Sequence, residues 1–131
     1  MRNVPEGTRG SYSKTVTHDD LASTLDSTLP AVMATRVMVG MMELAAMDAI
    51  KPFLESGESS VGVSIEVQHT AATPPGQKVQ AFAEVTRCEG RRLEFKVSAR
   101  DENEDIGSGA HRRAVIDVAK FNERLKSKVK T

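Results

Sequence analysis

The longest apolar stretch of the chain runs from Thr35 to Leu54 and reads TRVMVGMMELAAMDAIKPFL. Its apolar residues recur at steps of three and four, which is the spacing of one face of an α-helix. That face consists of Met38, Met42, Ala45, Ala49 and Phe53, and it is widened by Val37, Met41, Leu44 and Ile50. A helix that is apolar on most sides is normally enclosed by other elements. The stretch therefore predicts a central helix from Thr35 to about Glu55.

Near the middle of this helix lies a carboxylate, Glu43. Side chains three and four positions away along a helix are neighbours, and around Glu43 none of them can pair with a charge: they are Val39, Gly40, Ala46 and Met47. Such a carboxylate needs a partner elsewhere in the fold, or binds a ligand, or has its pKa raised by desolvation. Glu43 is therefore the first candidate for a catalytic group. The alternative is a structural carboxylate that is paired within the core.

Length and charge limit what the chain can be. Its 131 residues suffice for one domain but not for two. We therefore expect a single domain over residues 1–131, with frayed termini at 1–10 and 123–131. The 18 basic and 18 acidic side chains cancel, and no basic cluster stands out, which argues against a nucleic-acid partner.

Cysteine usage and hydropathy indicate the compartment. No stretch has the apolar run of a signal peptide or of a membrane-spanning helix. The single cysteine, Cys88, excludes an internal disulfide and fits a reducing cytoplasm. We expect a cytoplasmic protein without a membrane partner, in which Cys88 is a packing residue. The three histidines lack the spacing of metal ligands, so neither a metal nor a cofactor is expected.

After the helix, apolar and polar residues alternate with the period of a half-buried β-strand. The first such run contains Val61, Val63, Ile65 and Val67. The same parity predicts that His69 faces inward with them. Further strands are predicted over residues 79–85, 93–99 and 106–118, and Gly107 and Gly109 in the last one indicate a bulge or a close backbone approach. Residues 11–17, before the helix, are typical of an edge strand.

A long apolar helix combined with about five antiparallel strands predicts an α+β protein of the hot-dog fold, in which the sheet wraps around the helix. The chain has only four phenylalanines, one tyrosine and no tryptophan, so the core of one subunit is thin. Burial by a second subunit is therefore expected, and we predict a homodimer.

Several runs of the sequence resemble the fluoroacetyl-CoA thioesterase family of hot-dog proteins. The most specific run is HTAATPPG at residues 69–76, because eight residues seldom agree by chance. Other matching runs are MVG at 38–40, ME at 42–43, EGRRL at 89–93, and IGSG at 106–109 with His111, Arg113, Ala114 and Val115. The resemblance extends from about Thr35 to Asn122.

The resemblance implies a set of site residues. The catalytic threonine, glutamate and histidine of the family fall on Thr35, Glu43 and His69. A glycine that contacts the thioester falls on Gly62, and an arginine near the active site falls on Arg113. The implied reaction is hydrolysis of a small acyl-CoA substrate to the acid and coenzyme A. Glu43 would act as general base or as nucleophile, and the residues alone do not choose between these roles.

One segment departs from the family. In the fluoroacetyl-specific enzyme the segment before the helix is a lid with phenylalanines that shape a small, dry pocket. Here residues 20–33 contain no aromatic side chain. The resemblance thus supports thioester hydrolysis, whereas fluoroacetyl specificity is not expected.

Each of these residues also has a plainer interpretation. Thr35 is a good N-cap for the helix, and on a straight helix it lies about 12 Å from Glu43. His69 is equally explained as a satisfied core histidine, and Gly62 as a strand glycine that leaves room for the helix. Arg113 is also explained as part of a solvated set with Arg112 and His111, and we expect His18 and His111 to lie at the surface.

Two other functions are compatible with the fold. One is an enoyl-CoA hydratase or dehydratase, although the aspartate–histidine motif of that class is not found. The other is an acyl-CoA-binding module without catalytic activity.

Overall fold

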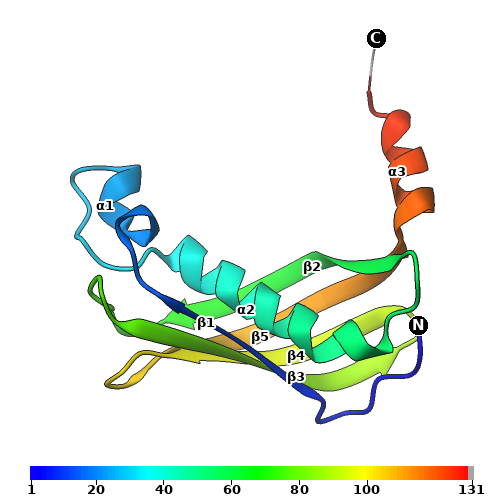
Figure 1. Cartoon of the computed structure of the whole chain (residues 1–131), viewed down its shortest axis with the longest axis horizontal. Coiled ribbons are helices and arrows are strands. Elements are labelled where there is room, and N and C mark those ends of the chain that lie inside the picture. Colours follow the sequence, from blue (N-terminus) through cyan, green and yellow to red (C-terminus); the bar gives the residue numbers. More distant parts are fainter. Residues whose placement is uncertain (130–131) are drawn as a thin grey trace.

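The computed structural model describes residues 1–129, and the predicted helix lies at its centre (Figure 1). Helix α2 spans Thr35–Ile50, and the 3-10 turn η2 spans Lys51–Phe53. Pro52 has no backbone N–H to donate, which explains why the α-helix ends before Glu55. The buried residues of α2 are Met38, Met41, Met42, Ala45, Ala46, Ala49 and Ile50. The predicted central helix is thus confirmed, with a shorter C-terminal end.

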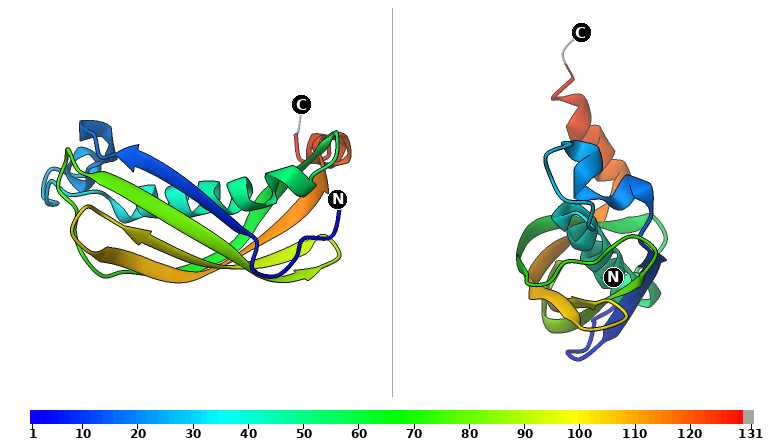
Figure 2. Two further views of the ribbon diagram at one scale, coloured as in Figure 1. Left: turned by 60° about the horizontal axis from the view of Figure 1, so that its bottom comes forward. Right: turned by 90° about the vertical axis from the view of Figure 1, so that its left-hand side faces the viewer.

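Five antiparallel strands curl around α2 (Figures 1 and 2). They are β1 (Arg9–Thr15), β2 (Glu58–His69), β3 (Lys78–Glu89), β4 (Arg92–Arg100) and β5 (Asp105–Asp117). Their order across the sheet is β1-β3-β4-β5-β2, which makes β1 and β2 the two edges. This is the predicted hot-dog fold.

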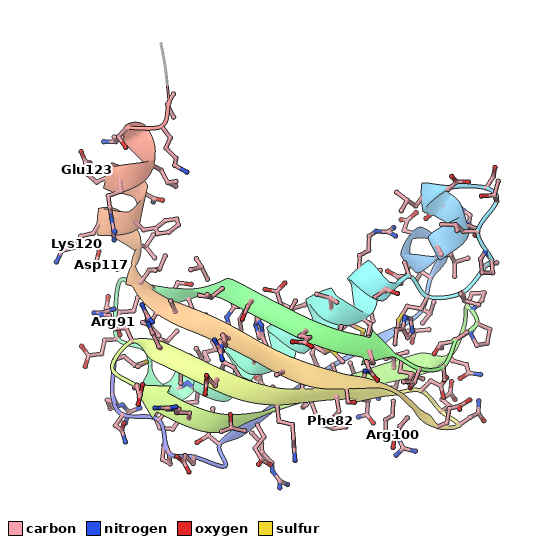
Figure 3. The ribbon with its side chains drawn as sticks, turned by 180° about the vertical axis from the view of Figure 1, so that it is seen from behind. Phe82, Arg91, Arg100, Asp117, Lys120 and Glu123 are labelled. Atoms are coloured by element: carbon pink, nitrogen blue, oxygen red, sulfur yellow. The ribbon has the colours of Figure 1, made fainter. Side chains whose placement is uncertain are left out.

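The inner face of the sheet follows the predicted alternation in β3 and β4. The buried residues of these strands are Val79, Ala81, Ala83, Val85, Leu93, Phe95, Val97 and Ala99. The residues that alternate with them face away from α2, as Phe82 and Arg100 do in Figure 3. The predicted close approach of another backbone segment is confirmed at Gly109 of β5. A Cβ atom at this position would lie 2.0 Å from the carbonyl oxygen of Glu66 on β2.

The predicted inner face of β2 is wrong at its start, because the strand contains a β-bulge. Gly62 pairs with Arg113 of β5, but Ser64 pairs with Arg112, so Val63 is an extra residue on β2. The side chain of Val63 is 63% exposed instead of buried. The bulge moves the inward positions by one residue.

The consequence of the bulge is that polar and small residues, rather than valines, face α2 at the start of β2. Ser60 is buried, and Gly62 lies directly against the side chain of Glu43. Beyond the bulge, Ile65, Val67 and His69 face inward as predicted, since Ile65 and Val67 pack against the core and His69 carries a buried ring nitrogen.

The N-terminal residues, predicted to be frayed, are held against the domain. Val4 is 1% exposed, the N–H of Gly7 donates to the carbonyl of Val85, and the amino group of Met1 lies 2.8 Å from Glu58. At the other end, α3 (Val118–Lys126) projects away from the sheet without a buried residue (Figure 1). No helix within residues 1–129 is long and apolar enough to cross a membrane.

Between β1 and α2, residues 16–34 form a compact connecting segment. It contains the 3-10 turn η1 (His18–Asp20) and the short helix α1 (Ala22–Leu25). A bridge between Leu21 and Met33 closes it. Asp20 anchors its base, because the carboxylate accepts from Lys14 at 2.6 Å and the backbone carbonyl accepts from the N–H of Ala34 at 2.9 Å.

Candidate active site

Glu43 finds its partner on the sheet, as its apolar helical neighbours require. Its Oε2 atom accepts a hydrogen bond from Nη1 of Arg113 at 3.0 Å. The arginine side chain is 4% exposed and the glutamate side chain 38% exposed. Within residues 1–129, Oε1 of Glu43 accepts no hydrogen bond. One carboxylate oxygen is thus held, and the other is available to a ligand or to water.

Arg113 is fixed by further contacts that the sequence did not reveal. Its Nε atom donates to the hydroxyl of Ser60 at 2.9 Å, and Nη2 donates to the carbonyl of Ser60 at 3.1 Å. Its Nη1 atom also lies 3.2 Å from Nε2 of His111. The interpretation of Arg113 and His111 as solvated surface residues is therefore wrong, since His111 is 1% exposed.

Gly62 makes room for this pair. A Cβ atom at Gly62 would lie 2.7 Å from Oε2 of Glu43 and 3.5 Å from Nη1 of Arg113. A side chain at this position would displace the carboxylate. The predicted close approach at Gly62 is thus to the side chain of Glu43, and an open hollow is lined here by Glu43, Gly62, Val63, Ser64, Ile65 and His111.

Thr35 and His69 form a second polar pair. Oγ1 of Thr35 lies 2.9 Å from Nδ1 of His69. Thr35 is the first residue of α2, and the N-cap position is occupied by Ala34. The interpretation of Thr35 as the N-cap is therefore wrong, and its hydroxyl is directed to the histidine.

His69 has an unsatisfied atom. Its Nε2 atom is buried and has no hydrogen-bond partner within residues 1–129. Burial lowers the pKa of the imidazole below its ordinary value, although the nearby backbone of Ala71 acts in the opposite direction. The ring is therefore neutral at pH 7. A buried polar atom without a partner costs free energy, so Nε2 of His69 is well suited to bind a polar group of a ligand.

A hollow beside the Thr35–His69 pair lies between the connecting segment of residues 16–34, the start of α2 and the loop after β2. Its walls are Ala22, Val32, Met33, Ala34, Thr35, His69, Thr70, Ala71 and Ala72. Most of these side chains are small and apolar, and none is phenylalanine, tyrosine or tryptophan.

The loop that follows His69 is anchored on both sides. The hydroxyl of Thr73 donates to Asp101 at 2.9 Å, and the carbonyl of Thr73 accepts from the N–H of Met33 at 2.8 Å. Thr73 is 0% exposed and Asp101 is 5% exposed. These bonds connect the loop to the residues just before Thr35, and so explain how Thr35 is held against His69.

The Glu43–Arg113 pair and the Thr35–His69 pair do not meet within one chain. Thr35 and Glu43 lie on the same uninterrupted helix, and eight residues of helix span about 12 Å. The residues implied by the resemblance therefore divide into two clusters: Glu43, Gly62 and Arg113 form one, and Thr35 and His69 form the other. Within residues 1–129, no three metal-ligating side chains gather to form a site.

The comparisons with known proteins agree on one family. The family model described as fluoroacetyl-CoA-specific thioesterase matches residues 16–119. The fluoroacetyl-CoA thioesterase of Streptantibioticus cattleyicolor is 50% identical over 115 residues, which are 88% of this chain and 83% of that protein.

Solved structures agree with the sequence comparison. A structure of the fluoroacetyl-CoA thioesterase has a TM-score of 0.91 at 42% identity, and the match covers 98% of this chain and 99% of the other. A thioesterase superfamily member from Thermus thermophilus has a TM-score of 0.88 at 34% identity, with 98% and 97% covered. Variants of the fluoroacetyl-CoA thioesterase have been solved with acetyl-CoA and with fluoroacetate.

Proposed function

Because the chain belongs to the fluoroacetyl-CoA-specific thioesterase family, we propose that it hydrolyses a small acyl-CoA to the free acid and coenzyme A. The observation that carries this proposal is the carboxylate of Glu43, with Oε2 held by Arg113 and Oε1 unbound within residues 1–129. Family membership also favours thioester hydrolysis over hydration of an enoyl-CoA or binding without turnover.

In the general-base route, Oε1 of Glu43 accepts a proton from a water molecule whose oxygen attacks the thioester carbonyl. The carbon–sulfur bond then breaks, and the sulfur leaves with the bonding electron pair and takes up a proton. The guanidinium of Arg113 holds the carboxylate by a charge-assisted hydrogen bond and keeps it directed at the site. Gly62 leaves the space in which Glu43 lies.

In the nucleophilic route, Oε1 itself attacks the carbonyl, coenzyme A leaves, and water cleaves the resulting anhydride. A single turnover in ¹⁸O-labelled water separates the two routes. Attack of water on the glutamyl carbonyl of an anhydride would place ¹⁸O in the peptide that contains Glu43. General-base catalysis places ¹⁸O only in the released acid.

The Thr35–His69 pair is suited to the other end of the thioester. Nε2 of His69 is the buried atom without a partner, and we assign it to the carbonyl oxygen or the leaving sulfur. Thr35 is the first residue of α2, and backbone amides at a helix N-terminus can stabilise a developing oxyanion. Together with Glu43 these groups supply water activation and charge stabilisation.

A homodimer would bring the two clusters together. Strand β2 is a sheet edge, and an unpaired edge readily pairs with another strand. On the exposed side of α2, Leu44 is 40% exposed and Met47 is 38% exposed, and Val63 of β2 is 63% exposed. We therefore place the partner along β2, with its apolar contacts on α2.

The positions on β2 fit a site shared between two copies. In an antiparallel pair of β2 strands with the two-fold axis at Glu66, Ile65 lies opposite the partner's Val67, both facing inward, and the bulge at Gly62 and Val63 lies opposite the partner's His69. Residues directly opposite each other in an antiparallel pair share one face of the sheet. Such a dimer is isologous, so each of its two sites combines Glu43 and Arg113 of one protomer with Thr35 and His69 of the other.

The pocket supports a small acyl group. Its lining by Ala22, Val32 and Met33 is apolar and lacks an aromatic ring. We propose that short acyl groups are accepted without strong preference for fluoroacetyl. The single cysteine, Cys88, supports a cytoplasmic location.

The direct test is release of free thiol from a panel of short-chain and aromatic acyl-CoAs by the purified protein, with Glu43→Gln as the matched variant. Hydrolysis that depends on Glu43 is expected. No thiol release above background, or equal turnover by Glu43→Gln, would overturn the proposal. Loss of crotonyl-CoA absorbance without thiol release would indicate a hydratase instead, and calorimetric binding without turnover a binding module.

A further inference from the structure

His111 is a buried polar residue that the proposed chemistry does not use. It lies on the inner face of β5, two residues before Arg113, and is 1% exposed. Its ring stacks on Phe95 of β4, with the ring centroids 5.9 Å apart and the planes at 28°. Its Nδ1 atom lies 2.8 Å from the carbonyl oxygen of Ser64, and its Nε2 atom lies 3.2 Å from Nη1 of Arg113.

These two contacts determine the state of the ring. A carbonyl oxygen only accepts a hydrogen bond, so Nδ1 of His111 must carry the proton that reaches Ser64. A guanidinium only donates, so Nε2 must offer its lone pair to Arg113. Both contacts are made only by the neutral imidazole with its proton on Nδ1. A protonated ring would direct an N–H at the arginine.

The guanidinium of Arg113 is consequently held at all three nitrogens. Ser60 accepts from Nε and Nη2, and Nη1 is shared between His111 and Glu43. One N–H of Nη1 is directed to His111, and the other is therefore directed to Oε2 of Glu43. Without His111, the Nη1 end of the guanidinium would be held by Glu43 alone.

We propose that His111 is a positioning residue for Glu43, which it orients through Arg113 so that Oε1 faces the thioester. This inference rests on the proposed thioesterase function and adds a residue to it. The groups that face His111 are Arg113 of β5, Glu43 of α2, the carbonyl of Ser64 on β2 and the ring of Phe95 on β4.

The surroundings keep His111 in the required form. Burial lowers the pKa of the imidazole, and the positive charge of Arg113 lowers it further, while the carbonyl of Ser64 and the carboxylate of Glu43 act in the opposite direction. The net result is a ring that is neutral at pH 7. The neutral form is the one that accepts from Arg113.

Two substitutions separate the polar role from packing. His111→Leu keeps an apolar side chain next to Phe95 but removes both hydrogen bonds. His111→Gln retains an acceptor for Arg113. Arg112→Ala is the matched control, because Arg112 is the next residue, faces outward and pairs with Glu94. The kcat and KM of each variant are measured with the best acyl-CoA, together with the melting temperature.

We expect His111→Leu to lower kcat roughly tenfold to a hundredfold with little change in KM, because a small misplacement of a catalytic group has effects of this order. His111→Gln should recover much of this loss, and Arg112→Ala should leave kcat unchanged. In an Arg113→Met background, which retains measurable activity, His111→Leu should cause little further loss, since His111 acts through Arg113.

The outcomes distinguish this inference from the function on which it rests. Hydrolysis that depends on Glu43 but is unaffected by His111→Leu would overturn the positioning role alone. A loss in kcat that is as large in the Arg113→Met background, or is not recovered by glutamine, would also overturn it, because packing alone would then explain the effect. If the wild-type protein releases no thiol from any acyl-CoA, the proposed function fails and the positioning role fails with it.

Discussion

Nη1 of Arg113 lies 3.0 Å from Oε2 of Glu43, although the two residues are 70 positions apart in the sequence. This contact joins the central helix to the last strand of the sheet. It also orients the carboxylate, because the other nitrogens of the guanidinium are held by Ser60. The proposed reaction depends on this pair.

Replacing Arg113 by methionine tests the pair. The apolar chain keeps the buried volume, but Ser60 and Nε2 of His111 lose the donor that Arg113 supplies, so we expect the free energy of unfolding to fall by about 2–5 kcal/mol. Because Glu43 then loses its fixed orientation, kcat should fall by about a hundredfold. Thiol release and urea unfolding measure the two effects, and a variant with unchanged kcat would show that the pair is not needed.

Two glycines of the sheet should respond differently to alanine. At Gly62 the added methyl group meets the flexible end of Glu43 at 2.7 Å, so the carboxylate moves and activity is lost while stability changes little. At Gly107 it meets the backbone oxygen of Gln68 at 2.8 Å and the sulfur of Met38 at 2.5 Å. Overpacking there should cost about 1–3 kcal/mol of stability.

Thermal unfolding and kcat of both glycine variants decide this prediction. Gly62→Ala should melt near the wild-type temperature but turn over poorly, and Gly107→Ala should melt earlier. An active Gly62→Ala protein would show that the position of Glu43 is not critical.

Thr35 should be required for its hydroxyl. Thr35→Ser keeps the oxygen that lies 2.9 Å from Nδ1 of His69, and Thr35→Ala removes it. Losing one such hydrogen bond costs about 0.5–1.5 kcal/mol, so kcat/KM should fall up to roughly tenfold in the alanine variant alone. The stability of Thr35→Ala should match the wild type, because Ala34 is the N-cap. Equal activity of the two variants would be inconsistent with a role for the hydroxyl.

Stability should decrease as the pH falls below neutrality. Burial lowers the pKa values of His69 and His111 in the folded protein, with neighbouring backbone groups acting against it. The unfolded chain therefore binds protons at these side chains at a higher pH, near their ordinary value of about 6.5. Stability rises with pH wherever the unfolded state binds more protons.

The stability that depends on neutral His69 and His111 is therefore fully present above about pH 6.5. It is lost as the pH falls from there through the pKa values of the two histidines in the folded protein. Urea unfolding at pH 8, 6.5 and 5.5 measures it, and His111→Leu should show a weaker dependence than the wild type. A protein that is more stable at the lowest of these pH values than at the highest would contradict the assignment of two neutral, buried histidines.

The helix and the fold class were predictable because they depend on local periodicity. The apolar face around Met42 has the period of a helix, and the alternation around Val97 has the period of a strand. The bulge at Val63 was not predictable, because the register of β2 is determined by its pairing with β5. The misplaced inner face of β2 follows from that one inserted residue.

The candidate site was predictable only in part. Glu43 stood out because its helical neighbours cannot pair with it, whereas His69, Thr35 and Gly62 came from the family resemblance. His111 shares the inward parity of Val115, and this signal could have identified it as buried. It was missed because charged and polar residues in a strand are usually solvated.

A heterodimer of two inactive variants tests the shared site. One chain carries Glu43→Gln and the other His69→Ala, and different affinity tags allow the mixed dimer to be isolated. If each site combines Glu43 of one protomer with the partner's His69, one of the two sites is intact. The heterodimer should then have about half the wild-type activity, whereas both parent homodimers stay near background.

A second heterodimer provides the control. Glu43→Gln in one chain and Arg113→Met in the other damage the same cluster in both sites, so this combination should stay inactive. Thiol release by the Glu43→Gln/His69→Ala heterodimer is the most direct measurement. About half of the wild-type rate is expected, and a rate no higher than that of the parent homodimers would contradict a catalytic site formed between Glu43 and the partner's His69.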